Sequence, residues 1–122
     1  MRFVDVEAYV LPFIRGFVPG VTVGTKVPNP RPAVFVRAWA NGGAAVNRVL
    51  ERAQITVDVW APSTTEAAYL AGDIRHAFLN NSGQLVLVRA VEEVTRPYPV
   101  PDETSERYRA TYALTIRAPR RP

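Results

Sequence analysis

The sequence contains no cysteine and a single histidine, His76. The lack of cysteine excludes disulfide bonds, thiolate nucleophiles and cysteine-ligated metals, and one histidine cannot build a multi-histidine metal centre. No apolar run approaches the roughly 18 residues of a membrane-spanning helix. Arg2, Asp5 and Glu7 occupy positions where a signal peptide would be apolar. We therefore expect no catalytic activity, no cofactor, no metal and no membrane partner.

The remaining composition is that of one globular domain spanning residues 1–122. Hydrophobic residues make up 48% of the chain and charged residues 21%, which excludes wholesale disorder. The 15 Lys and Arg against 11 Asp and Glu give a net charge of +4. Typical domains have roughly 100–150 residues, so this length leaves little room for a second domain.

Proline is in clear excess, with 11 residues in the chain, about twice the average usage of ~5%. Prolines alternate with other residues in two segments, 27–32 and 96–101. Each proline removes a ladder donor and biases the preceding residue toward extended geometry, so neither segment suits a central strand. We expect two stiff, exposed arms near the polyproline II conformation, acting either as rigid loops or as contacts to a partner.

The hydrophobic pattern predicts an alternation of helices and strands. We expect a helix after Asp5 that kinks or stops near Leu11 because of Pro12, and a second helix of roughly 17 residues after Ser63. Between the helices we expect a short strand within 21–27, a strand at 33–40 and a return strand ending at 55–59. After the second helix we expect a strand from Leu85 toward Val94 and a strand at 107–117. Asn41-Gly42-Gly43 predicts a hairpin turn, and Ser63 with Glu66 has capping-box spacing. The order predicts an α+β fold, a mostly antiparallel sheet of about five strands with one long and one short kinked helix packed on one face.

Few residues offer catalytic chemistry. His76 falls opposite the apolar stripe of the long helix and should face solvent. Glu92 and Glu93 are adjacent on a strand and point to opposite faces, so they cannot act as an acid/base pair. Asp58 lies on a polar strand face, where we expect it to pair with an arginine of a neighbouring strand. The segment at 20–26 resembles a phosphate loop only superficially, because the Walker spacing and the following helix are both missing.

Basic residues line one face of the last predicted strand. Arg107, Arg109 and Arg117 share that face, and Arg120 and Arg121 continue it into the tail. Such a stripe can neutralise phosphates, but the strand places its tyrosines on the opposite, apolar face, where they cannot stack on bases. We therefore favour a polar face that is solvated or faces another subunit.

Four segments, taken together, match the pattern of a known family. They are VGTKVPNPRP at 23–32 leading into AVFV at 33–36, NGG at 41–43, RAQITVDVWAP at 52–62 running into the alanine-rich helix, and PD at 101–102 followed by RYRATYALTI at 107–116. The chain resembles the tail terminator (tail-completion) proteins of long-tailed bacteriophages. The segments cover most of the chain in order, and the proline segment with the strand-to-helix junction is the most specific part.

The resemblance implies a structural virion protein without catalytic residues. Members of the family form a hexameric ring that caps the head-proximal end of the tail tube, stops tube polymerisation and joins the tail to the head connector. The implied partners are further copies of the chain, the tail tube protein and the head-tail connector or stopper protein. Assembly would occur in the host cytoplasm, and DNA would pass through the ring without sequence-specific binding.

We expect partner contacts at the proline arms, the hairpin tip and the basic stripe. The residues concerned are Asn29, Arg31, Asn41, Gly42, Gly43, Tyr98, Arg107, Arg109 and Arg117. The hairpin tip at 41–46 should project, so its deletion should preserve folding but impair joining. Two alternatives stay open: another head-tail connector component, such as a head-completion or stopper protein, and a small basic nucleic-acid-binding domain.

Overall fold

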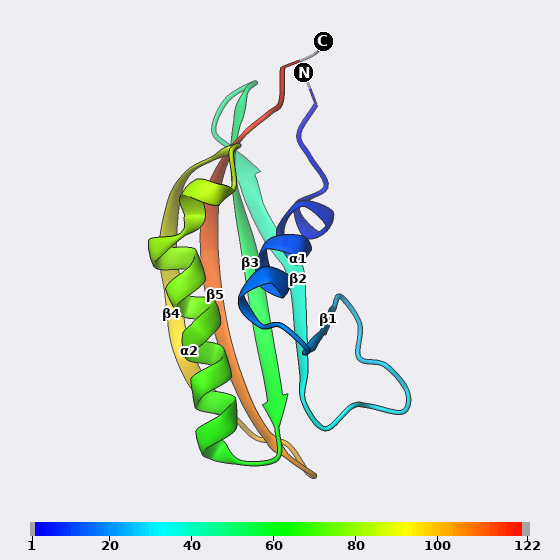
Figure 1. Ribbon diagram of the computed structural model, residues 1–122. Helices are drawn as coiled ribbons and strands as arrows, with labels where there is room; N and C mark the ends of the chain where they lie inside the picture. The colour runs from blue at the N-terminus through cyan, green and yellow to red at the C-terminus, as the bar shows by residue number, and fades with distance from the viewer. Residues whose placement is uncertain (1, 121–122) are drawn as a thin grey trace.

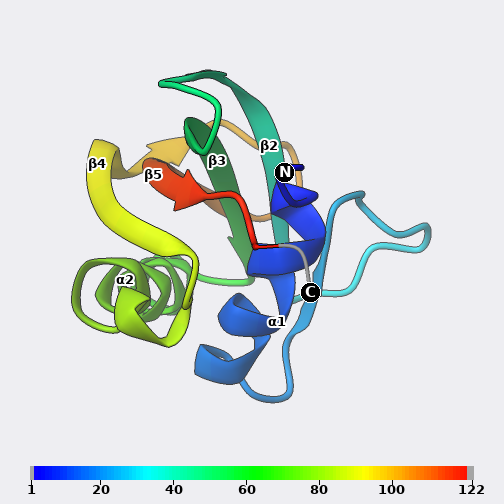
Figure 2. The same ribbon diagram turned by 90° about the horizontal axis from the view of Figure 1, so that it is seen from above.

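The computed structural model describes residues 2–120, which form a five-stranded sheet with two helices (Figure 1). In chain order the elements are α1 (Val6–Phe17), β1 (Thr22–Gly24), β2 (Phe35–Ala45), β3 (Leu50–Ala61), α2 (Thr64–Asn80), the 3₁₀ turn η1 (Ser82–Gln84), β4 (Val88–Val100) and β5 (Glu106–Arg117). The strand order is β1-β2-β3-β5-β4, and only the β1–β2 pair is parallel. Both helices lie on one face of the sheet (Figure 2), so the predicted α+β class and element order are confirmed. None of the helices in this range is long and apolar enough to cross a membrane.

The helices cover the apolar face of the sheet. Alternate residues of the strands and the predicted stripe of α2 form this core, whose buried members include Ile55, Val57 and Val59 of β3, Tyr112, Leu114 and Ile116 of β5, and Ala67, Ala71, Ile74, Ala77 and Phe78 of α2. Phe78 stacks on Tyr112 with 4.6 Å between the ring centroids, as offset aromatic pairs prefer. This contact holds the long helix against β5.

The position of α2 follows from local sequence. The Ser63 hydroxyl accepts a hydrogen bond from the Glu66 N–H at 3.2 Å, an interaction worth about 1 kcal/mol. The helix then runs for 17 residues and ends at Asn80, as predicted.

The first helix passes through its proline. Asp5 caps the start of α1 as expected, but the helix does not stop before Pro12 and continues to Phe17. Proline removes one helical hydrogen bond, whereas Phe13 and Ile14 in the following turn are buried in the core. Packing against the sheet therefore extends the helix beyond the point where the local sequence favours a stop.

The hairpin between β2 and β3 turns later than predicted. Asn41-Gly42-Gly43 lies inside β2, where the register shifts between Ala40 and Gly43 and forms a bulge. Gly42 and Gly43 have φ values of +112° and +124°, which glycine adopts without strain. The chain reverses at 46–49, so these residues, and not 41–46, form the projecting tip.

One proline segment lies in a loop, as expected, whereas most of the other is part of a strand. Residues 27–32 lie in the β1–β2 loop (Figure 1), which must return along β1 because the two strands are parallel. β4 begins at Val88 and extends beyond Val94 to Val100, so it contains Pro97 and Pro99. An edge strand tolerates these prolines because its outer side makes no ladder hydrogen bonds.

Gly43→Ala should lower the free energy of unfolding by about 2 kcal/mol or more, because the φ is positive and an added Cβ would overlap the Arg52 carbonyl oxygen. Gly72→Ala is the matched control. An added Cβ there meets nothing within 4 Å, so the substitution should stabilise α2 by about 0.5–1 kcal/mol. Urea unfolding followed by circular dichroism measures both, and equal effects would contradict the bulge.

Candidate functional site on the open face of the sheet

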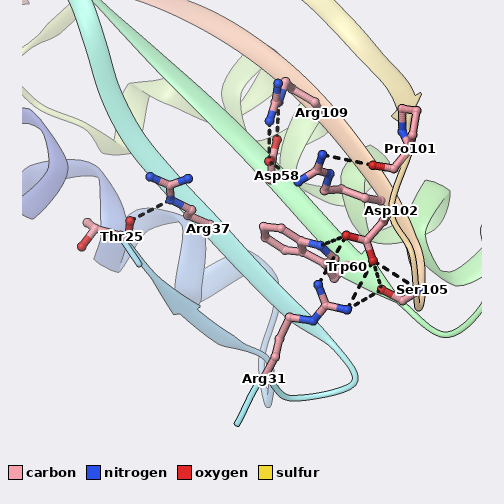
Figure 3. A network of polar contacts seen from close by, with 10 residues as sticks. Thr25, Arg31, Arg37, Asp58, Trp60, Pro101, Asp102, Ser105 and Arg109 are labelled. Carbon is pink, nitrogen blue, oxygen red and sulfur yellow. Dashed lines mark hydrogen bonds and ion pairs between the residues drawn. The ribbon is translucent and has the colours of Figure 1, made fainter. Parts of the chain in front are cut away.

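Both helices lie on one face of the sheet, which leaves the opposite face open (Figure 2). That open face carries charged and aromatic side chains. Alternate residues of the three central strands point to it, and the strand register sets Asp58 of β3 between Arg37 of β2 and Arg109 of β5. Loops at one end of the sheet add further members. We call the following residues the open-face cluster: Arg31, Arg37, Trp39, Asp58, Trp60, Asp102, Arg107 and Arg109. Figure 3 shows the polar contacts among them, with Arg31, Arg37, Asp58, Trp60, Asp102 and Arg109 labelled.

Asp58 lies at the centre of the open-face cluster. Its side chain is 1% exposed, and it accepts hydrogen bonds from Nε and Nη2 of Arg109 at 2.7 and 2.9 Å. Nη1 of Arg107 lies 3.8 Å from the same carboxylate. The hydrogen bond to Asp58 raises the pKa of Arg109 above its usual value. The predicted pairing of Asp58 with an arginine of a neighbouring strand is confirmed.

Trp39 makes cation–π contacts with two guanidinium groups. The Arg37 Cζ is 4.1 Å from the Trp39 ring centroid, and the Arg109 Cζ is 5.6 Å from it. Cation–π contacts of this kind contribute about 0.5–1 kcal/mol at exposed sites. Nε of Arg37 also donates a hydrogen bond to the Thr25 carbonyl at 2.9 Å. Trp39 and Arg37 are both half-buried, so this part of the cluster is ordered and still accessible.

Trp60 and Asp102 connect the two proline-rich parts of the chain (Figure 3). Arg31, from the β1–β2 loop, donates hydrogen bonds to Asp102 at 3.3 Å and to Ser105 at 3.1 Å. Nε1 of Trp60 donates to Asp102 at 3.4 Å. Arg31 and Arg107 lie 5.7 and 5.5 Å from the Trp60 ring centroid. The β1–β2 and β4–β5 loops are therefore fixed to each other across the end of the open face.

These donors keep Asp102 ionised. Burial alone would raise the pKa of Asp102, but hydrogen bonds from Arg31, Ser105 and Trp60 outweigh burial and lower it from 3.8 to about 2. The side chain is 14% exposed, so the surrounding donors replace most of its water. The carboxylate thus remains available to bind Arg31 throughout the neutral range.

The structure separates the predicted contact residues into groups. Arg31, Tyr98, Arg107 and Arg109 meet on the open face, where Tyr98 of β4 is opposite Arg109 and 40% exposed. Asn29 is exposed in the β1–β2 loop, Asn41, Gly42 and Gly43 form the β2 bulge, and Arg117 ends β5 opposite Leu50. Arg121 lies outside the described residues.

The basic stripe of β5 differs from a simple solvated face. Arg107 and Arg109 are half-buried on Asp58, and the neighbouring strands bring Trp39 and Trp60 to the same side. The tyrosines of β5 face the core as predicted, yet the arginine face has aromatic side chains from other strands. The alternating pattern of residues 35–39 predicts that Trp39 lies on the same face of its strand as Arg37. That Trp39 also lies near Arg109 of β5 depends on how the strands pair in the sheet.

The other candidate residues take their expected positions. His76 is exposed on α2. Glu92 pairs with Arg52 of β3 at 2.8 Å, whereas Glu93 pairs with Arg75 of α2 at 2.8 Å. The two glutamates therefore point to opposite faces of the sheet, as predicted, and each forms an ion pair with an arginine.

Neither a scan against protein-family models nor a search of curated proteins finds a match to this sequence. Within residues 2–120, no three His, Cys, Asp or Glu side chains are grouped as a metal site would require. The open-face cluster is the largest set of interacting polar and aromatic side chains in the described structure, and it is the candidate functional site.

The free energy of unfolding should fall as pH is lowered from about 4 to about 2, and Asp102→Asn should remove part of this fall. The lowered pKa of Asp102, about 2 against 3.8, means that its charged form stabilises the fold above the unfolded pKa. This contribution is lost as pH falls through the folded pKa. The difference between the wild-type and variant unfolding free energies, measured in urea at several pH values, should shrink in acid.

Glu103→Gln is the control for that experiment, because its carboxyl is exposed in the same loop and forms none of the described hydrogen bonds. This substitution should leave the acid-induced loss of stability nearly as large as in the wild type. A gap between wild type and Asp102→Asn that stays constant with pH would contradict the ionised contact.

Arg109→Leu should destabilise the fold more than Asp58→Asn, by about 2–3 against about 1 kcal/mol. Loss of Arg109 leaves the buried carboxylate with Arg107 alone, at 3.8 Å. Loss of the Asp58 charge leaves two arginines whose long side chains can reach solvent. Urea unfolding of both variants measures the order, and the reverse order would show that the arginines are the costlier groups to leave unpaired.

Proposed function

We propose that this chain is a tail terminator protein, a structural and non-catalytic subunit of a phage tail. Its copies assemble into a hexameric ring at the head-proximal end of the tail tube. The ring ends polymerisation of the tube protein and provides the surface that binds the head-tail connector or stopper protein. DNA passes through the ring without sequence-specific binding, and assembly takes place in the host cytoplasm. The resemblance of four segments to this family supports the proposal.

The observation that carries the proposal is the composition of the open face. Arg37, Trp39 and Tyr98 are partly exposed on a side of the sheet that neither described helix covers (Figure 2). Arginine, tryptophan and tyrosine are enriched at the centres of protein–protein interfaces, where a few such residues contribute most of the binding energy. An exposed face of this composition supports a role in assembly.

The open face is also ordered before any partner binds. Trp39 makes cation–π contacts with Arg37 and Arg109, and Asp58 accepts hydrogen bonds from Arg109. At the end of the face, the Arg31–Asp102 ion pair fixes both loops at 3.3 Å. Side chains that are already fixed lose little conformational freedom on binding, which favours docking between rigid rings.

A nucleic-acid-binding domain is the second candidate, because Arg37, Trp39 and Tyr98 combine positive charge with surfaces for base stacking. Much of the positive charge is nevertheless neutralised within the chain. Asp58 binds Arg109 and lies near Arg107, and similar pairing occupies Arg31. Phosphates would compete with these pairs, which favours the assembly role. A head-completion or stopper protein would use the same kind of surface and differs in the partner it binds.

Arg37→Glu should weaken binding to isolated tail tubes by at least about tenfold, since it reverses a charge on the open face. Arg15→Glu is a matched control. Both guanidinium groups donate a hydrogen bond to a main-chain carbonyl, Arg37 to Thr25 at 2.9 Å and Arg15 to Val23 at 3.1 Å, but Arg15 belongs to α1 on the other face. Light scattering with and without tubes measures the assembled mass.

The same measurement separates the candidate functions. A mass of about six chains, in solution or only on tubes, supports the terminator role. Binding to a connector without binding to tubes indicates a head-completion or stopper protein. A monomer that ignores tubes and binds DNA, with affinity falling steeply as salt rises, would replace the proposal with the nucleic-acid candidate.

A further inference from the structure

A shallow hollow lies on the outer side of α2, at its first turns, which come directly after β3 in the chain. Its volume is about 400 Å³, and it is lined by Thr64, Thr65, Ala68 and Tyr69. Tyr69 is 73% exposed, an unusual position for a large aromatic side chain without a partner. The hollow belongs to a helix face that no other described element covers, and it lies outside the open-face cluster.

The end of the molecule around this hollow is acidic. Glu66 lies in the first turn of α2, Glu103 in the β4–β5 loop and Glu106 at the start of β5, opposite the last residue of β3. All three are exposed. None takes part in the ion pairs found within residues 2–120. An incoming apolar group would therefore be best accompanied by a positive charge.

The β2–β3 hairpin tip carries both an exposed apolar side chain and a positive charge. Val46 is 61% exposed, and Arg48 beside it is also exposed. The turn is rigid, because Oδ1 of Asn47 accepts hydrogen bonds from the N–H groups of Val49 and Leu50, each at 2.9 Å. The tip thus holds an apolar side chain and a cation outward on a preformed turn, which lowers the entropy cost of docking.

The β2–β3 hairpin tip and the start of α2 lie at opposite ends of the molecule (Figure 1), and the residues that line the hollow belong to the start of α2. Three arginines, Arg48, Arg117 and Arg120, lie at the hairpin end together with Glu51. A chain cannot insert its own tip into its own hollow, so any contact between them joins two copies. Contact between two different surfaces of identical chains is heterologous, and it produces a ring when the rotation closes.

We propose that the hairpin tip of one copy seats Val46 in the α2 hollow of the next copy, with Arg48 facing Glu66. This interface rests on the proposed ring and names the two surfaces of neighbouring subunits that meet in it. Opposite charges at the two sites determine that the tip of one copy meets the hollow of the next. The small apolar contact determines where on the hollow the tip docks.

Charge reversal tests the pairing. Arg48→Glu and Glu66→Lys should each weaken self-association by at least about tenfold, because each places like charges at the contact. An equimolar mixture of the two variants should regain the wild-type mass, since an acidic tip then meets a basic hollow and a basic tip meets an acidic one. Asp73→Lys, an exposed site further along α2, is the control and should assemble normally. Light scattering measures all four samples, alone and on tail tubes.

Substitution of a valine tests the apolar part of the contact. Val46→Asp should weaken self-association by a similar factor, because it buries a carboxylate beside Glu66. Val86→Asp is the matched control: Val86 is 76% exposed and outside the hairpin, so its substitution should leave the assembled mass unchanged. Far-UV circular dichroism confirms that each variant is folded.

The outcomes distinguish this interface from the proposed function. A wild-type ring that both charge variants leave intact, or a mixture that fails to reassemble, overturns the interface while the ring proposal stands. A wild-type chain that stays monomeric both in solution and on tail tubes overturns the proposed function, and the interface with it. Loss in each single variant with recovery in the mixture supports both.

Discussion

The buried carboxylate of Asp58 sets the arrangement of the open face. A carboxylate that is 1% exposed needs charged partners to replace water. The antiparallel register of β3 and β5 supplies Arg109 directly opposite it and Arg107 nearby. Those arginines in turn lie over Trp39 and Trp60. The requirement of one buried charge thus orders the side chains of three strands.

The two faces of the sheet perform different tasks. β3 is buried on both sides, because Val57 and Val59 lie beneath the helices while Asp58 and Trp60 lie beneath the arginines. The apolar face supplies most of the hydrophobic stabilisation, which is proportional to the apolar area removed from water. The open face contributes directional contacts whose outer atoms stay accessible. The open face can therefore be rigid without taking residues from the core.

Local signals predicted most of the fold but little of the open-face cluster. Ser63 and the stripe of α2 act within a few residues, so the helix could be located from sequence. Asn41-Gly42-Gly43 misled, because a bulge and a hairpin turn both use glycine at positive φ, and the choice depends on where β3 pairs. The prolines of β4 predicted an arm outside any strand, because the sequence does not show that β4 is an edge strand, which tolerates proline. The polar strand face around Asp58 predicts an arginine partner, although not which arginine. No local pattern predicts the ion pair of Asp102, because its partner Arg31 is 71 residues away in the sequence.

That sequence distance bears on when the open-face cluster forms during folding. Arg31 and Asp102 are 71 residues apart, and Asp58 and Arg109 are 51 residues apart. Asp102 lies in the β4–β5 loop and Arg109 in β5, the last strand, so both contacts need the C-terminal part of the chain to be in place. A nascent or partly folded chain therefore lacks the ordered open-face cluster. A partner that required this cluster would bind only those copies whose sheet is complete.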